Sequence, residues 1–182
     1  MFRSDKPEVG TFRVDYAKAA GFYEVLQRDM KPLYLLVFLL TANHRQAEQC
    51  FALAVENSFE GQFAFKEFTR TWIERNMIRN AIGIVCPASA SSGVQRDLWN
   101  PGQQTTHRDA EINAVTQLAP LERFVFVMSI LQRYSAWECS LLLNCSTKKV
   151  ARAQLRALRR LTAFGTFRPE VEARVLHTGG PA

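Results

Sequence analysis

The sequence predicts an all-α protein made of two small helical domains joined by a flexible linker. Apolar residues recur three and four positions apart through both halves of the chain, which is the spacing of one face of an α-helix. No clear strand pattern or internal repeat occurs up to residue 85. Residues 86–104 are rich in small and polar residues, which bury too little surface to order themselves. With 182 residues, the chain is long enough for two small domains.

The first half is expected to form a helical bundle over residues 15–85, preceded by a disordered arm over residues 1–14. Lys31-Pro32 should interrupt the helical pattern, because proline lacks the backbone N–H that a helix needs. The apolar stripes of the helices are explained most simply as the core of the bundle. The expected helices span Asp15–Met30, Leu33–Leu40, Arg45–Asn57 and Phe63–Val85, with Thr41 or Asn43 as the cap of the third.

Aromatic and basic residues are interleaved in the last of these helices. One explanation is a platform for single-stranded nucleic acid, where rings stack on bases and cations contact phosphates. The other is that the rings fill the core and the cations face solvent. The second is favoured, because a bundle this small needs large side chains to fill it. The residues concerned are Phe63, Phe65, Phe68 and Trp72, with Lys66, Arg70, Arg75 and Arg79.

A linker over residues 86–104 is expected to separate the two domains, and Asn100-Pro101-Gly102 within it is a strong turn signal. The second domain should span residues 105–163, and an irregular tail should follow over residues 164–182. The sequence leaves open whether the two domains pack together. The first two helices expected in the second domain are Asp109–Leu118 and Leu121–Gln132. In the tail, Val171–Leu176 could form one last turn of helix.

The stretch from Tyr134 to Leu161 predicts a helix-turn-helix. Ser135 is placed to cap a short helix from Ala136 to Leu143, because its hydroxyl can accept a hydrogen bond from an unpaired backbone N–H. Asn144-Cys145-Ser146 then breaks the pattern, and Ser146 is placed to cap a second helix that begins at Thr147. Two short helices joined by a short turn are typical of the motif whose second helix enters the major groove of DNA.

The second helix of this motif has a cationic face and an apolar face. On a helical wheel, six cations fall within an arc of about 120° and four small apolar residues lie opposite. Like charges four residues apart repel each other, and no acidic residue occurs nearby in the sequence to neutralise them. We therefore expect this face to contact nucleic acid rather than only water. The cations are Lys148, Lys149, Arg152, Arg156, Arg159 and Arg160, and the apolar residues are Val150, Ala153, Ala157 and Leu161.

The net charge supports a localised contact with a polyanion. The chain carries a formal charge of +6, but residues 139–169 hold seven basic residues and no acidic one. Subtracting these seven from the 23 basic residues leaves 16, against 17 acidic residues, so the remainder is about neutral. The basicity thus belongs to one region rather than to the whole surface.

The second half resembles the C-terminal domain of bacterial RNA polymerase sigma factors, and is most similar to the short extracytoplasmic-function type. The resemblance rests on Leu118-Ala-Pro-Leu-Glu-Arg-Phe-Val-Phe-Val, Tyr134-Ser, Glu138, Leu142-Leu143-x-Cys-Ser, Val150, Arg156-Ala and Leu161. In that family the second helix reads the upstream promoter element. The resemblance implies promoter DNA as a partner. The residues expected to contact the DNA are Ser146, Thr147, Lys148, Lys149, Arg152, Arg156, Arg159 and Arg160.

The first half resembles the sigma-factor domain that binds the polymerase clamp and melts the promoter. The matching features are L-Y-x-L-x-x-x-L-T-x-N, Ala47-Glu48, Phe68, Trp72-Ile73, Arg75 and Arg79-Asn80. The resemblance implies core RNA polymerase as a partner and an anti-sigma factor as a further one. The implied contacts with the melted strand are Arg75, Arg79 and Asn80, and those with polymerase are Gln46, Glu48, Gln49 and Leu53.

The expected function is that of a sequence-specific transcription initiation factor that recruits core polymerase to promoters. The alternative is a sigma-like DNA-binding regulator or interaction module that no longer binds polymerase. It arises because Gln46, Gln49, Ala52 and Leu53 stand where the family usually has acidic and glutamine residues. Arg79-Asn80 also follows the tryptophan, Trp72, one residue later than the arginine-asparagine pair usually does in the family.

Other classes of function have little support in the sequence. Phosphate-binding glycine loops, nucleophile elbows and metalloprotease motifs are absent, so we expect neither an enzyme nor a cofactor. The four cysteines and three histidines have no metal-ligand spacing. The longest apolar run, Leu33 to Leu40, is far below the roughly 20 residues that span a bilayer. A cytoplasmic protein without a membrane partner is the expectation.

Overall fold

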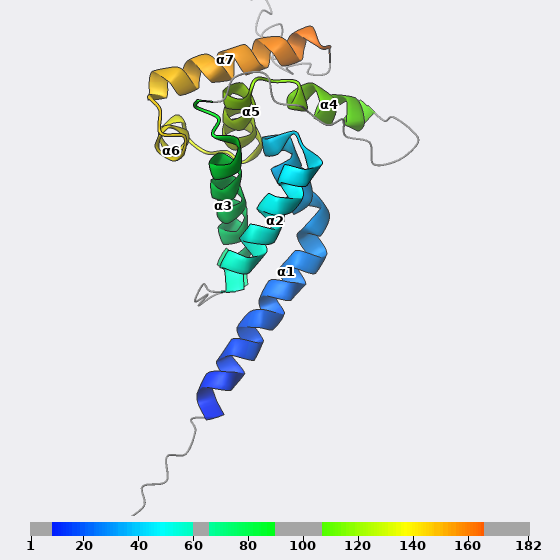
Figure 1. Ribbon diagram of the computed structural model, residues 1–182, viewed down its shortest axis with the longest axis vertical. Coiled ribbons are helices and arrows are strands. Elements are labelled where there is room, and N and C mark those ends of the chain that lie inside the picture. Colours follow the sequence, from blue (N-terminus) through cyan, green and yellow to red (C-terminus); the bar gives the residue numbers. More distant parts are fainter. Residues whose placement is uncertain (1–8, 60–65, 90–106, 166–182) are drawn as a thin grey trace, which may run out of the picture.

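The computed structural model describes residues 9–59, 66–89 and 107–165, and these ranges contain helices and turns but no strand. The all-α prediction is therefore confirmed (Figure 1). The expected tail helix at Val171–Leu176, and most of the expected linker, lie outside these ranges. The elements are α1 (Val9–Thr41), α2 (His44–Phe59), α3 (Lys66–Val85), α4 (His107–Thr116), α5 (Pro120–Phe126), the π-helical η1 (Val127–Leu131), α6 (Ala136–Leu142) and α7 (Thr147–Ala163).

The helix α1 is continuous over 33 residues and has Pro32 inside it. The predicted break at Lys31-Pro32 is therefore wrong, and the helix starts within the stretch 1–14 that was expected to be a disordered arm. Its first turns extend beyond α2 and α3 (Figure 1). Helical geometry persists past the proline because the segment that follows is held in the core. Its buried residues are Leu33, Leu36, Val37, Phe38, Leu39 and Leu40.

A tight turn joins α1 to α2, and Asn43 caps the second helix. The Asn43 side-chain oxygen accepts a hydrogen bond of 3.0 Å from the backbone N–H of Gln46. Thr41, the other candidate cap, donates instead to the carbonyls of Val37 and Asn43. The turn places Ala42 at a φ of 54°. The cap is local in sequence, which is why the residue pattern could narrow it to these two positions.

In the second half, α7 lies across α5, and α6 precedes it at the same end of the molecule (Figure 1). The predicted helix Leu121–Gln132 exists, but its second part is π-helical, with the Gln132 N–H bonded to the Val127 carbonyl. The apolar stripe predicted for α7 is confirmed. Its four members, Val150, Ala153, Ala157 and Leu161, are completely buried.

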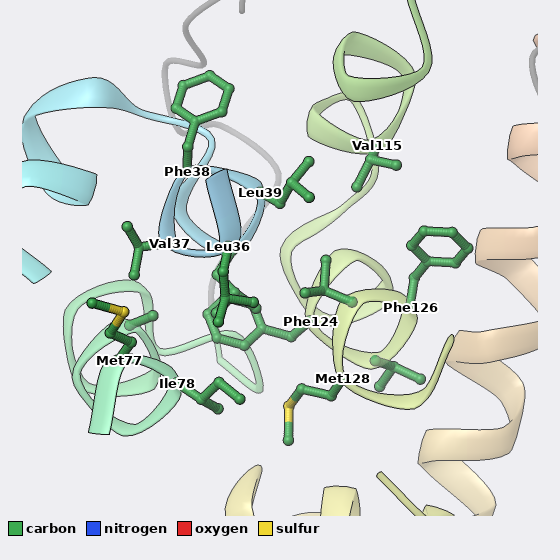
Figure 2. Close-up of a cluster of buried hydrophobic side chains, with 14 of the residues drawn as sticks. Leu36, Val37, Phe38, Leu39, Met77, Ile78, Val115, Phe124, Phe126 and Met128 are labelled. Atoms are coloured by element: carbon green, nitrogen blue, oxygen red, sulfur yellow. The ribbon is translucent and has the colours of Figure 1, made fainter. Parts of the chain in front are cut away.

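The two halves share one hydrophobic core. Figure 2 shows Leu36 and Val37 of α1 and Met77 of α3 in one cluster with Phe124 of α5 and Met128 of η1. The question that the sequence left open is thereby answered: residues of the two expected domains pack against each other.

The side chain of Arg123 reinforces this junction. It is 2% exposed and donates to the carbonyls of Leu40 and Thr41, at distances of 3.0 and 3.2 Å. It also donates to the carbonyls of Thr116 and Leu118, at 3.3 and 3.2 Å. Leu40 and Thr41 end α1, and Thr116 ends α4. A buried cation therefore satisfies carbonyls at the C-termini of two helices, where positive charge is favourable.

Candidate nucleic-acid interface

The helix-turn-helix is built from capping interactions within the segment. Ser135 and Glu138 form a reciprocal capping box at the start of α6, since each side chain accepts a hydrogen bond from the backbone N–H of the other residue. The Glu138 carboxylate accepts hydrogen bonds from the backbone N–H and the hydroxyl of Ser135, and these two bonds hold the pKa of Glu138 below its ordinary value. At the start of α7, the Ser146 hydroxyl accepts from the Lys149 N–H at 3.3 Å. Both predicted caps are confirmed.

The turn between the two helices depends on a left-handed residue. Asn144 has a φ of 47°, a conformation that asparagine tolerates better than most residues. The Cys145 N–H then bonds the Ser140 carbonyl at 3.0 Å, which closes the end of α6. The turn therefore directs α7 away from α6 within a few residues.

The six cations of α7 are all exposed, together with Ser146 and Thr147 at its start. Within residues 9–59, 66–89 and 107–165, Lys148, Arg152 and Arg159 form no ion pair or side-chain hydrogen bond. They lie within about 40° of one another on the helical wheel, directly opposite the buried stripe, and form the solvent-facing side of the cationic face. The first turn of α7 contains no acidic residue, and two lysines at a helix N-terminus oppose the helix dipole.

The sequence near this face holds no acidic residue, but an acidic residue far away in the sequence contacts two of its arginines. Arg156 Nε donates a hydrogen bond of 2.8 Å to Oε1 of Glu122 in α5. Arg160 Nη1 lies 3.0 Å from the other oxygen of the same carboxylate and forms an ion pair with it. The carboxylate is 34 residues away from Arg156 in the sequence, and only the packing of α5 against α7 brings them together.

The remaining edge cation also has a partner. Lys149 Nζ donates to the Ala88 carbonyl at 3.3 Å, just after the end of α3. The side of the face that holds Arg156, Lys149 and Arg160 is thus held by intramolecular contacts, while the solvent-facing side with Lys148, Arg152 and Arg159 is not. Six cations and one carboxylate leave this surface with a net charge of +5.

Arg75 and Arg79, which were predicted to contact a melted strand, lie on α3 and are not part of the cationic face of α7. Both are exposed on α3 and line a cleft of about 180 Å³ with Tyr134, Glu138 and two leucines of α6. Burial raises the pKa of Tyr134, and a hydrogen bond with the Arg75 side chain acts in the opposite sense. Arg75 therefore faces the second half of the molecule as well as solvent.

Asn80 does not join them in that cleft. It is half-buried, and its Nδ2 has no hydrogen-bond partner within the described part of the chain. Of the three residues predicted to contact a melted strand, the structure therefore brings only the two arginines together.

The residues predicted to bind polymerase lie along α2. Glu48, Gln49 and Leu53 are exposed, whereas the side-chain oxygen of Gln46 is buried. Glu48 borders a largely apolar groove of about 1020 Å³ between α1, α2 and α4. The sequence did not predict this groove, because α4 forms one of its sides and comes from the other half of the chain. On α1 the groove is lined by Met30, a large apolar residue whose side chain is exposed.

The comparisons with known proteins give a solved sigma-factor structure of low sequence similarity. No protein-family model matches the sequence, and no curated protein matches it. Among solved structures, the chain is similar to the sigma factor RpoE of Bartonella quintana, in its complex with the anti-sigma factor NepR. The two are 15% identical, the match covers 81% of this chain and 98% of that chain, and the TM-score is 0.49.

Glu122 is the residue of the candidate interface that sequence reasoning missed. A signal for it existed, since an acidic residue beside the apolar residues of α5 needs a partner once it is buried. Its side chain is 5% exposed, and the ion pairs with the two arginines offset the cost of burying a carboxylate.

Chemistry of other kinds has no assembled site in the described ranges. No group of three or more His, Cys, Asp or Glu residues is placed to hold a metal ion there. Burial raises the pKa of the Cys50 thiol to about 12 and that of Cys139 to about 11, so neither forms the reactive thiolate near neutral pH. None of the helices described is long and apolar enough to cross a membrane.

Proposed function

We propose that this chain is a sequence-specific DNA-binding transcription initiation factor of the sigma type, with α7 as the helix that reads duplex DNA. The observation that carries the proposal is α7 itself. One of its faces is completely buried on the domain, and the other presents six exposed cations with one neighbouring carboxylate. A rigid helix that carries a localised positive face fits the major groove of a duplex.

The N-terminal half of α7 is the part proposed to contact bases. In helix-turn-helix proteins the first residues of the second helix reach the base edges, while residues further along contact the backbone. Thr147, Lys148 and Arg152 are exposed in this half, and neither cation is held by a described partner. Arg152 has a guanidinium that can donate two parallel hydrogen bonds to one guanine. It is therefore the residue we assign to base recognition.

A selection from a pool of randomised duplexes tests this assignment. We expect the intact chain to enrich a preferred sequence, and its affinity to fall steeply as salt is raised. Arg152→Ala should weaken binding to that sequence by about 1–3 kcal/mol and relax the preference at one base position. Arg45→Ala, an exposed arginine on α2, is the matched control and should bind as the wild type does. Unchanged affinity and preference in Arg152→Ala would remove α7 from base recognition.

Recruitment of core RNA polymerase is proposed from the family resemblance and from the exposure of Glu48, Gln49 and Leu53 on α2. A second candidate function is a sigma-like regulator that binds DNA without recruiting polymerase. The buried side-chain oxygen of Gln46 favours it, because that group is withdrawn from any partner. An anti-sigma factor remains a prediction of the resemblance.

A further inference from the structure

We infer that Glu122 is a positioning residue that converts Arg156 and Arg160 into a preformed clamp for a backbone phosphate of the bound duplex. The inference rests on the proposed function, and it adds a residue of α5 to the DNA-binding surface. It also assigns Arg156 to the phosphate backbone rather than to base recognition.

The geometry of the three side chains supports a clamp. Each oxygen of the Glu122 carboxylate contacts a different arginine, Arg156 at 2.8 Å and Arg160 at 3.0 Å. The two arginines lie one helical turn apart on α7, so their side chains are neighbours on its surface. A single buried carboxylate therefore fixes both guanidinium groups from one side.

The guanidinium groups keep the capacity to bind a second anion. A guanidinium has five N–H donors, and Glu122 takes one hydrogen bond from Arg156 and forms an ion pair with Arg160, so most donors of the two groups are left for another ligand. Both arginine side chains are 52% exposed, whereas the Glu122 side chain is 5% exposed. The carboxylate is thus on the protein side of the arginines and the free donors are on the solvent side. An oxyanion is the ligand that such donors select.

The charges lead to the same conclusion. Two arginines four residues apart repel each other, and one carboxylate offsets this repulsion while leaving a net charge of +1. Long side chains lose rotamer freedom when they bind, and the contacts with Glu122 already restrict these two. The clamp lies on the α5 edge of the cationic face, so one strand of the duplex would run along that edge while Lys148 and Arg152 face the groove.

Replacing the carboxylate by its neutral isostere tests the idea through the sign of the effect. Glu122→Gln makes the surface more positive by one charge. If Glu122 only screened the arginines, duplex binding would become tighter. If it positions them, binding to the selected duplex should weaken by about tenfold, as the loss of a charge-assisted hydrogen bond would produce. Glu56→Gln, at an exposed position of α2, repeats the charge change away from α7 and should leave binding unchanged.

A double-mutant cycle separates positioning from a general effect on the fold. In a chain that carries Arg156→Gln and Arg160→Gln, adding Glu122→Gln should weaken binding no further. The salt dependence should also lose about one unit of slope in the arginine variants, because a phosphate contact is removed. A further tenfold loss in the triple variant would overturn the inference, because Glu122 would then act through other residues.

A second variant keeps the test valid if Glu122→Gln fails to fold, which a thermal melt would reveal. Arg156→Lys with Arg160→Lys retains both charges but lacks the planar guanidinium fork. We expect about a tenfold loss of affinity, and unchanged affinity would overturn the clamp. Absence of salt-sensitive duplex binding in the wild-type chain would instead defeat the proposed function. Wild-type binding combined with equal or tighter binding by Glu122→Gln would defeat the clamp alone.

Discussion

Glu122 and Arg123 are neighbours in the sequence, and their side chains leave α5 toward different parts of the molecule. Glu122 reaches α7, and Arg123 reaches the ends of α1 and α4. The sequence placed both residues within a family-like motif, but it assigned a role to neither. Their roles depend on partners 34 and 83 residues away, which no local pattern specifies.

Replacing Arg123 with Met tests its role at the scale of one residue. Met keeps much of the length of the side chain but removes every donor, so the carbonyls of Leu40, Thr41, Thr116 and Leu118 would lose a buried partner. We expect the free energy of unfolding to fall by about 3–5 kcal/mol. Denaturant unfolding measures it. A loss below about 1 kcal/mol would mean that water replaces the guanidinium at little cost.

At the scale of the element, α1 shows how burial outweighs local preference. A proline inside a helix costs about 3 kcal/mol, because one backbone hydrogen bond is lost and its ring crowds the preceding turn. The eight residues after Pro32 include six buried apolar side chains, each contributing about 1.5–3 kcal/mol by burial. The sum exceeds the cost of the proline, so the helix continues through a position where the sequence predicted a break.

Pro32→Ala should therefore stabilise the protein. The substitution restores a helical N–H at an exposed position, while the unfolded chain gains some freedom. The expected net gain is about 2 kcal/mol in the free energy of unfolding, measured by denaturant titration. Lys31→Ala, at the exposed neighbouring position, is the control and should change stability by less than about 0.5 kcal/mol. Destabilisation by Pro32→Ala would show that the helix needs its proline.

At the scale of the whole molecule, the two halves form one body around a shared core. The proposed polymerase contacts on α2 and the proposed DNA contacts on α7 are therefore held in a defined relation. Lys149 adds a bond from α7 to the segment after α3. Function is best measured on the intact chain, because cutting it between the halves would expose the core.

A pull-down with purified core RNA polymerase tests the proposed recruitment. We expect the intact chain to be retained, and Glu48→Arg on the exposed face of α2 to reduce retention by about tenfold through charge reversal. Glu56→Arg makes the same change elsewhere on α2 and should be retained as the wild type is. No retention of the wild-type chain, together with intact duplex binding, would favour the regulator that does not recruit polymerase.

The sequence by itself determined the features that depend on residues close together in the chain. These are the helical character of both halves, the caps at Ser135 and Ser146, and the division of α7 into a buried stripe and a cationic face. Helical periodicity and capping act over three or four residues, so a pattern of residues is enough to specify them.

Only the tertiary structure decided which of the predicted site residues have partners. It paired Arg156 and Arg160 with Glu122, placed Arg75 beside Tyr134, and joined the two halves through Arg123. It also kept α1 continuous through Pro32. The physical reason is the same in each case. Burial and ion pairing act between residues that are close in space, whatever their separation in the chain, so they become visible only when the helices have packed.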